Sequence, residues 1–323
     1  MPDRHVSNDD LAGILDTSDE WIRQRTGIEA RYWVGEGADV GTSDLALEAS
    51  KIALQRAGWE PTDLDLIVLA TMTSDVYVPG SGVILQHKLG AKNVPALDIR
   101  QQCTGFLHGL ELCDAYIRSG KAQKILMVGA ETQSRFLQLT TRNRDTAVIF
   151  ADGAGAACIE ARETNEETGI LASVFHADGR YADVLRVGVP ARKSGPVMNA
   201  EVLARQEYFP YMDGGTVFKL AVTLLPKVAR ELLEKAGIQP EALDMVVPHQ
   251  ANLRINEAFR DRMKIPHEKV YNNIQQYGNT TAATIPIALD ELMEKEILKS
   301  GHNVMFIGLG AGLTWGGVMY RLP

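Results

Sequence analysis

Cysteine is scarce in this sequence, and the few cysteines it has stand far apart. Only Cys103, Cys113 and Cys158 occur among 323 residues, which is too few for the disulfide framework of a small secreted protein. No Cys-x-x-Cys pair and no Cys/His cluster has the ligand spacing of a zinc site. Each cysteine is therefore either a small core residue or a catalyst, and we expect no metal.

Long apolar runs and an excess of positive charge are also missing. No run reaches the roughly 18 to 20 apolar residues that span a membrane, and the opening MPDRHV cannot serve as a signal peptide. The formal net charge is −8, so the chain as a whole has no electrostatic footprint for nucleic acid or an anionic membrane. We expect a cytoplasmic protein that binds neither nucleic acid nor membrane.

Two stretches of the chain repeat one another. AGWEPTDLDLIV (57–68) and AGIQPEALDMVV (236–247) share Ala-Gly, a nearby Pro and a Leu-Asp pair before an apolar run. Each follows a segment with helical periodicity and leads into an apolar strand. Apolar strands such as LDLIVLAT (64–71) and NVMFIGL (303–309) alternate with helical segments, which favours sheets covered on both faces. The sequence thus predicts an α/β fold built from two similar halves.

A polar stretch near residues 161–169 separates these halves. We expect an N-terminal half of residues 1–165 and a C-terminal half of residues 166–323. Residues 188–215 interrupt the second half with Gly, Pro and aromatic residues. Long insertions of this kind more often cover a substrate than fill a core, so we expect a covering loop at 188–215.

The chain turns at Cys103, between the apolar strand ALDI and a helix. From Thr104 onward, apolar residues recur at helical spacing. Cys103 therefore lies at a helix start, where free N–H groups and the helix dipole stabilise a thiolate and lower its pKa. The polar surroundings make Cys103 a candidate nucleophile, whereas the alternative of a buried structural thiol fits Cys113 and Cys158.

Two polar positions in the second half supply candidate partners for Cys103. His249 follows the strand LDMVV, at the kind of strand end where α/β folds place their sites, and imidazole can move a proton or donate to an oxyanion. Asn279 opens the next helical segment, either as an N-cap or as an amide donor. Cys, His and Asn together suggest a papain-like protease. That alternative fits poorly, because no protease signature surrounds Cys103 and the set is divided between duplicated halves.

Six motifs stand in order along essentially the whole chain. They are DTSDEWIRQRTGI (16–28), CTGF (103–106), IFADGAG (149–155), PHQANLR (248–254), GNTTAA (278–283) and GAGLTWG (310–316). In this order they are highly specific, and the chain resembles the β-ketoacyl-acyl carrier protein synthase III family of the thiolase superfamily. The resemblance implies a thiolase-like duplicated fold, in which helices cover two mixed sheets in αβαβα layers.

This resemblance implies an initiating condensing enzyme of type II fatty-acid synthesis. Such an enzyme joins an acyl-CoA primer to malonyl-acyl carrier protein by decarboxylative Claisen condensation. Cys103 matches the nucleophile that carries the acyl group, and His249 and Asn279 match the pair that binds the malonyl thioester carbonyl. The backbone N–H groups of Cys103 and Ala311 match the oxyanion hole. No cofactor is implied, and no Gly-x-Gly-x-x-Gly follows a strand.

The resemblance also implies binding residues and a homodimer. The residues that match coenzyme A contacts are Trp21, Arg25, Thr26, Arg144, Phe218 and Asn252. A guanidinium opposite an indole is a natural clamp for adenine, which fits Trp21 with Arg144. Lys219 and Arg254 match residues that receive the acidic carrier protein, the alternative being an ordinary solvated surface.

The chain departs from the family pattern at three places. The family begins with a short strand before the position of Pro2, and this sequence does not contain it. Either the start is truncated or another segment takes the position of this strand in the sheet, because a missing strand leaves backbone N–H and C=O groups of its neighbour unpaired. Ala311 stands where many members have Gly, which matters only if the backbone there needs positive φ. Val78 aligns with a Phe that in some members closes the partner's acyl pocket, so we expect primers longer than acetyl to be accepted.

Three other functions would use some of these residues. A related condensing enzyme would prime polyketides, make alkyl-quinolones or condense two acyl chains. A thiol hydrolase would release free acid and CoA without CO2. A binding module without turnover is disfavoured by the intact set of Cys103, His249 and Asn279.

Overall fold

Two four-stranded mixed sheets form the frame of the chain, in a computed structural model that describes residues 1–188, 200–205 and 208–323. The strand order is β4-β3-β5-β6 in the first sheet and β10-β11-β12-β7 in the second. The strands are β3 (Leu66–Ala70), β4 (Ala96–Ile99), β5 (Lys124–Thr132), β6 (Asp152–Glu160), β7 (Gly169–Ala177), β10 (Met245–Pro248), β11 (Asn303–Gly310) and β12 (Thr314–Arg321).

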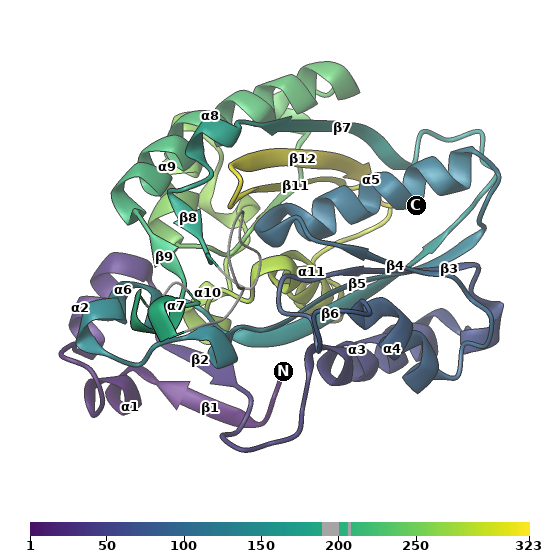
Figure 1. Cartoon of the computed structure of the whole chain (residues 1–323). Coiled ribbons are helices and arrows are strands. Elements are labelled where there is room, and N and C mark those ends of the chain that lie inside the picture. Colours follow the sequence, from purple (N-terminus) through teal and green to yellow (C-terminus); the bar gives the residue numbers. More distant parts are fainter. Residues whose placement is uncertain (189–199, 206–207) are drawn as a thin grey trace.

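Helices fill the space between the sheets and cover their outer faces (Figure 1). The inner helices are α5 (Gly105–Arg118) and α11 (Thr284–Glu294). The outer helices are α3 (Thr42–Ala57) and α4 (Ser81–Leu89) on the first sheet, and α8 (Gly214–Ala236) and α9 (Leu253–Met263) on the second. This is the αβαβα layering that the resemblance implied.

Side chains of β3 show why the central strands have no polar positions. Val68 belongs to the core between the sheets, together with Phe106 of α5. Ile67 and Leu69 point to the other face and pack with Leu85 of α4. Because successive side chains of a strand face opposite sides, a strand covered on both faces must be apolar throughout.

The two halves repeat the same order of elements, which confirms the duplication predicted from the sequence. α3 is followed by Gly58 and α8 by Gly237, at φ of 68° and 67°, a conformation that glycine adopts without a Cβ clash. A 3-10 turn comes next in both halves, Pro61–Asp63 and Pro240–Ala242, and leads into β3 or β10.

The first residues of the chain form a small layer outside the two main sheets. β1 (Arg4–Ser7) pairs antiparallel with β2 (Ala30–Trp33), and α1 (Asn8–Ala12) and α2 (Asp19–Thr26) complete this layer. In the second sheet, β7 pairs with the outer edge of β12. In the described part of the chain, no strand pairs with the corresponding outer edge of β6 in the first sheet. Among the described residues, no other segment takes the place of the missing first strand, which was one of the two alternatives, and the outer edge of β6 has no partner strand.

Short elements connect these layers. They are α6 (Arg144–Ala147), β8 (Leu185–Arg186), α7 (Ala200–Arg205), β9 (Tyr211–Met212) and α10 (Ile274–Tyr277). Much of the expected covering loop at 188–215 lies outside the described residues, although β8 and β9 pair antiparallel at its two ends. Within the described ranges, no helix is long and apolar enough to cross a membrane.

Candidate active site

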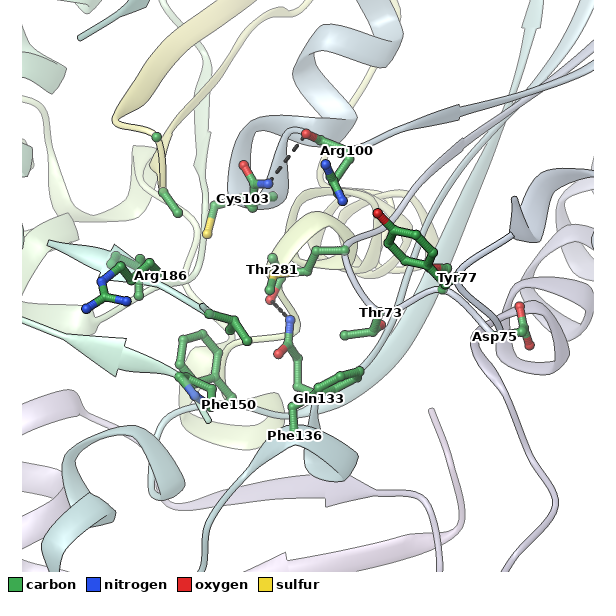
Figure 2. A pocket seen from close by; sticks show the side chains of 18 of the residues that line it. Thr73, Asp75, Tyr77, Arg100, Cys103, Gln133, Phe136, Phe150, Arg186 and Thr281 are labelled. Atoms are coloured by element: carbon green, nitrogen blue, oxygen red, sulfur yellow. Dashed lines mark hydrogen bonds between the residues drawn. The ribbon is translucent and has the colours of Figure 1, made fainter. Parts of the chain in front are cut away.

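Cys103 lies at a sharp corner between a strand and a helix. β4 ends at Ile99, a 3-10 turn spans Gln102–Thr104, and α5 begins at Gly105, as the sequence predicted. Gln102 has a φ of 47°, a left-handed conformation that residues with a side chain rarely adopt. This turn places the Cys103 side chain in the wall of a cavity, where Figure 2 shows its sulfur.

The end of β11 in the second half closes around Cys103. A Cβ at Gly310 would lie 2.7 Å from the Cys103 Cβ, so a residue without a side chain is needed there. The backbone N–H of the next residue, Ala311, favours the thiolate of Cys103 and so lowers the pKa of the thiol. Ala311 does not have a positive φ, so alanine in place of the family's common glycine requires no strained backbone.

The thiol of Cys103 is protonated at neutral pH in this conformation. Burial raises its pKa to about 12, and the carboxylate of Glu131 adds to the shift, because both disfavour a thiolate. The N–H groups of Ala311 and of Cys103 itself lower the pKa without offsetting burial. The prediction that the helix start lowers this pKa is therefore wrong, since it took no account of how fully the two halves bury the sulfur.

His249 and Asn279 come from the second half and meet Cys103 at one cavity. His249 follows β10 directly, and Asn279 lies between α10 and the 3-10 turn Thr281–Ala283. All three side chains line a cavity of about 100 Å³. The structure thus brings together the three residues that the sequence singled out for chemistry.

His249 is a neutral imidazole with one nitrogen left free. Its Nδ1 lies 2.7 Å from the hydroxyl oxygen of Thr284, whereas its buried Nε2 has no hydrogen-bond partner among the described residues. Burial lowers the pKa of His249 to about 3, because an imidazolium would lose its hydration. A neutral ring can donate one hydrogen bond without readily giving up its proton.

Asn279 is held by its side-chain oxygen and its backbone. Oδ1 accepts a hydrogen bond of 2.9 Å from the N–H of Thr281, although the N-cap of the following 3-10 turn is Thr280. Its own N–H donates to the carbonyl of Ile149, and its carbonyl accepts from the N–H of Ala151. With Oδ1 engaged in this way, the Nδ2 group is left to serve as a donor at the cavity.

A larger cavity of about 520 Å³ also includes Cys103 in its lining (Figure 2). Met72, Phe136 and Phe150 contribute apolar side chains to its wall, and this volume suits a small organic chain. Val78 is absent from the lining, and 78% of its surface is exposed. Its role in an acyl pocket of a partner chain therefore stays a prediction.

Trp21 is flanked by two guanidinium groups of its own chain. The central carbon of Arg25 lies 4.3 Å and that of Arg144 lies 4.6 Å from the centroid of the indole. Arg144 also donates a hydrogen bond to the backbone oxygen of Asp16. For an adenine to lie between Trp21 and Arg144, the Arg144 side chain would have to move away from the Trp21 indole, so this clamp stays a prediction.

Thr26 does not have the surroundings of a ligand contact. Its side chain is buried, and the hydroxyl donates to the carbonyl of Ile22 at 2.7 Å. The same oxygen accepts a hydrogen bond from the N–H of Ile28 at 3.0 Å. In this structure the hydroxyl stabilises the end of α2, and the contact of Thr26 with coenzyme A stays a prediction.

Asn252 joins the two halves beside the smaller cavity. Its Nδ2 donates to the backbone oxygen of Arg25 at 2.9 Å, and its Oδ1 accepts from the N–H of Arg254 at 3.0 Å. The guanidinium of Arg254 lies over Phe218, 5.4 Å from the ring centroid. Phe218 and Asn252 both line the smaller cavity, and the neighbouring Lys219 is exposed.

The other two cysteines lie away from the cavities. Cys113 is buried in the core between the sheets, and Cys158 packs against the core under α3 and α4. In the part of the chain that the structure describes, no three His, Cys, Asp or Glu side chains are grouped so that they could hold a metal ion. Both cysteines have the core positions expected from the sequence.

Comparison with known proteins gives a consistent result. Two family models match, 3-oxoacyl-[acyl-carrier-protein (ACP)] synthase III over residues 97–179 and its C-terminal part over residues 233–322. A curated β-ketoacyl-[acyl-carrier-protein] synthase III of Fusobacterium nucleatum subsp. nucleatum is 44% identical over 99% of this chain and 95% of the relative. The chain belongs to this family.

Solved structures of related synthases share the fold. The 3-oxoacyl-[acyl-carrier-protein] synthase III from Aquifex aeolicus VF5 has a TM-score of 0.89 at 40% identity, over 99% of this chain and 96% of that one. The priming β-ketosynthase from the R1128 polyketide biosynthetic pathway has a TM-score of 0.89 at 33% identity, over 100% and 93%. The resemblance and the thiolase fold are thereby confirmed, and the synthase is an acyltransferase, a condensing enzyme that initiates fatty-acid synthesis.

Two residues near the candidate residues Cys103 and His249 were not predicted. Glu131, at the end of β5, is fully buried and accepts hydrogen bonds from the hydroxyls of Thr73 at 2.7 Å and Thr71 at 3.2 Å. Burial raises the pKa of Glu131 to about 8. A carboxylate directly after the apolar run KILMVGA was a usable signal. Thr284, the partner of His249, had no such signal, because threonine is ordinary in that segment.

Proposed function

We propose that this synthase joins an acyl-CoA primer, acetyl-CoA or somewhat longer, to malonyl-acyl carrier protein by decarboxylative Claisen condensation. The products are a 3-oxoacyl-acyl carrier protein, CoA and CO2. The observation that carries the proposal is the small cavity at which Cys103, His249 and Asn279 meet. Cys103 also lines the larger cavity, which gives an acyl chain on its sulfur a place to lie.

The first half-reaction transfers the acyl group to Cys103. The sulfur attacks the carbonyl carbon of the acyl-CoA, the bond from that carbon to the CoA sulfur breaks, and the thiol proton ends on CoA. The N–H groups of Ala311 and Cys103, both of which favour negative charge on the Cys103 sulfur, would stabilise the oxyanion that forms next to it. Because the thiol has a raised pKa of about 12, we expect its proton to leave only as the attack proceeds.

The second half-reaction generates the carbon nucleophile. Loss of CO2 from the malonyl thioester leaves an enolate, whose oxygen would accept hydrogen bonds from His249 Nε2 and Asn279 Nδ2. Two neutral donors stabilise that oxygen without protonating it, which fits the low pKa of about 3 for His249. The enolate carbon then attacks the acyl carbonyl, the bond to the Cys103 sulfur breaks with its electron pair on sulfur, and a proton from solvent restores the thiol.

Substrate binding follows from the surroundings of this site. The proposed coenzyme A contacts are Trp21, Arg25, Thr26, Arg144, Phe218 and Asn252, of which Phe218 and Asn252 line the smaller cavity. Lys219 and Arg254 would receive the acidic carrier protein. Their position supports this role, because Arg254 lies over Phe218 and Lys219 is exposed beside it.

The same proposal includes a cytoplasmic homodimer. β4 is an edge strand of the first sheet, and Leu97 on this strand and Tyr77 and Val78 before it are exposed. An exposed apolar strand edge is normally covered in a stable protein, and a second copy would cover this one. We also propose the division into halves at residues 165 and 166, since β6 and β7 lie in different sheets.

Substitutions of the three catalytic residues test the chemistry. We expect Cys103→Ala to gain no acyl mass on incubation with acyl-CoA, as measured by intact-protein mass spectrometry. His249→Ala and Asn279→Ala should still gain that mass but release little labelled CO2 from malonyl-acyl carrier protein. Cys158→Ala is the matched control, because that cysteine touches neither cavity.

Other outcomes of this experiment identify other functions. Full condensation by Cys103→Ala would refute the proposed mechanism. Free acid and CoA without labelled CO2 would indicate a thiol hydrolase, and binding of acyl-CoA with no covalent product would indicate a binding module.

A polyketide-priming synthase is the second candidate. The observation in its favour is the 33% identity to the R1128 priming β-ketosynthase over 100% of this chain. Offering malonyl-acyl carrier protein, malonyl-CoA and a second acyl-CoA in parallel separates the pathways. A clear preference for malonyl-acyl carrier protein of fatty-acid synthesis is the expected result, and use of a second acyl-CoA or of malonyl-CoA would point to the related condensing enzymes.

A further inference from the structure

The hydroxyl of Thr284 stands between a catalytic ring and a backbone carbonyl. Its Oγ1 lies 2.7 Å from Nδ1 of His249 and 3.0 Å from the carbonyl oxygen of Thr281. Thr284, His249 and Thr281 are all buried. The hydroxyl carries a single proton, so it can donate to only one of these two neighbours.

Two arrangements are consistent with one hydroxyl proton. In the first, Thr284 donates to Nδ1, and the imidazole proton is on Nε2. In the second, Thr284 donates to the Thr281 carbonyl and accepts from an Nδ1–H, and Nε2 presents a lone pair. Since His249 is the enolate donor only in the first arrangement, the choice decides what the ring can do.

Both distances favour the first arrangement. Hydroxyl donors make shorter hydrogen bonds than N–H donors, roughly 2.7 to 2.8 Å against 2.9 to 3.0 Å between heavy atoms. The 2.7 Å contact of Thr284 with Nδ1 has the shorter length, and its 3.0 Å contact with the Thr281 carbonyl is longer than such a donor prefers. That carbonyl already accepts the backbone N–H of Thr284, whereas no other described residue hydrogen-bonds Nδ1.

We infer that Thr284 is a positioning residue, which donates its hydroxyl proton to Nδ1 of His249 and thereby keeps the imidazole proton on Nε2. Nε2 is the buried nitrogen that has no partner among the described residues, in a ring that lines the same cavity as Cys103. A fixed Nε2–H is a donor already in place when the malonyl thioester loses CO2. This inference rests on the proposed function, because it assigns how His249 acquires its donor.

The side chain of Thr284 is held well enough to act in this way. Thr284 is the first residue of α11, and its neighbour Ile285 is buried in the core between the sheets. The segment before it is tied to the first half, since Gln133 donates from Nε2 to the hydroxyl of Thr281 at 2.8 Å. A hydroxyl on a rigid helix start orients the ring more sharply than a loop residue would.

The direct test is the position of the imidazole proton in the unaltered protein. The ¹⁵N spectrum of the histidine-labelled synthase distinguishes protonated from unprotonated ring nitrogens, and the His249 signals are assigned by their loss in His249→Ala. We expect a protonated Nε2 and an unprotonated Nδ1. A protonated Nδ1 in the neutral ring would overturn the inference and remove His249 Nε2 as an enolate donor, whereas acylation of Cys103 and release of CO2 would still test the condensation itself.

The functional test compares Thr284→Val with Thr284→Ser. Valine keeps the shape and removes the hydroxyl, and we expect labelled CO2 release to fall roughly 10- to 100-fold, the range seen when a partner that orients a metal-ligating histidine is lost. The rate at which Cys103 gains acyl mass should stay within about twofold. Thr284→Ser, which keeps the hydroxyl, should restore CO2 release.

Ser50→Ala serves as the control for loss of a buried hydroxyl. Ser50 donates to the carbonyl of Ala46 at 2.6 Å within α3 and lines neither cavity. Wild-type CO2 release by Thr284→Val would overturn the inference, as would failure of serine to restore it. The proposed function fails on a different result, the absence of acyl mass on Cys103 in the unaltered synthase.

Discussion

Replacing Gly310 by alanine tests how tightly the two halves close around the nucleophile. The added Cβ would lie 2.7 Å from the Cβ, 3.1 Å from the backbone N and 3.3 Å from the Cα of Cys103. Carbon atoms in van der Waals contact are roughly 3.5 to 4.0 Å apart. Most of these neighbours are backbone or directly attached to it, so they cannot rotate away, and β11 and the Cys103 turn must separate by about 1 Å.

We expect Gly310→Ala to lower both stability and reactivity. Overpacking of this kind costs about 1 to 3 kcal/mol of unfolding free energy. Displacing a reacting group by about 1 Å reduces the rate by roughly 100-fold, so Cys103 should gain acyl mass that much more slowly. The effect is steric, because Gly310 does not have a positive φ that alanine would strain.

Urea unfolding and an intact-mass time course with acetyl-CoA measure the two effects. Gly179→Ala is the matched control, since a Cβ at Gly179 would meet nothing within 4 Å. We expect this control to differ from the unaltered synthase by less than about 0.5 kcal/mol. Acylation of Gly310→Ala within twofold of the unaltered rate, with unchanged unfolding, would show that β11 does not confine Cys103 as described.

Two further predictions concern Glu131 and Val78. Burial raises the pKa of Glu131 to about 8 from a value of 4.5, so the folded protein retains this proton where the unfolded chain has lost it, and stability should fall as pH rises from about 4.5 to about 8. Glu131→Gln cannot ionise and should flatten the dependence of Tm on pH; equal slopes for both proteins would contradict this. The unaltered synthase should accept C4 to C8 acyl-CoA as well as acetyl-CoA, and Val78→Phe should reject the longer primers. Acylation by acetyl-CoA alone in the unaltered protein would count against the role of Val78.

The architecture was accessible from the sequence because it depends on local patterns. The apolar run from Leu66 to Ala70 predicts a strand covered on both faces, and Val68 and Leu69 do face opposite cores. Gly58 and Gly237 mark matching helix ends in the two halves. These signals need only a few neighbouring residues, since periodicity and chain-reversing glycines act over a few positions.

The electrostatics of the site were not accessible in this way. The helix start at Cys103 is a local feature and was predicted, but the pKa of the thiol also depends on its burial, and Gly310 from the other half packs directly against Cys103.

By itself, the sequence determined the duplication, the family and the identity of the candidate residues Cys103, His249 and Asn279. It could do so because motif order and hydrophobic periodicity are properties of the linear chain. The tertiary structure decided that the Cys103 thiol is protonated, that His249 is neutral, and that Thr284 contacts its Nδ1. Burial and hydrogen bonding between segments far apart in the sequence set these properties, because desolvation and donor geometry depend on every atom that surrounds a group.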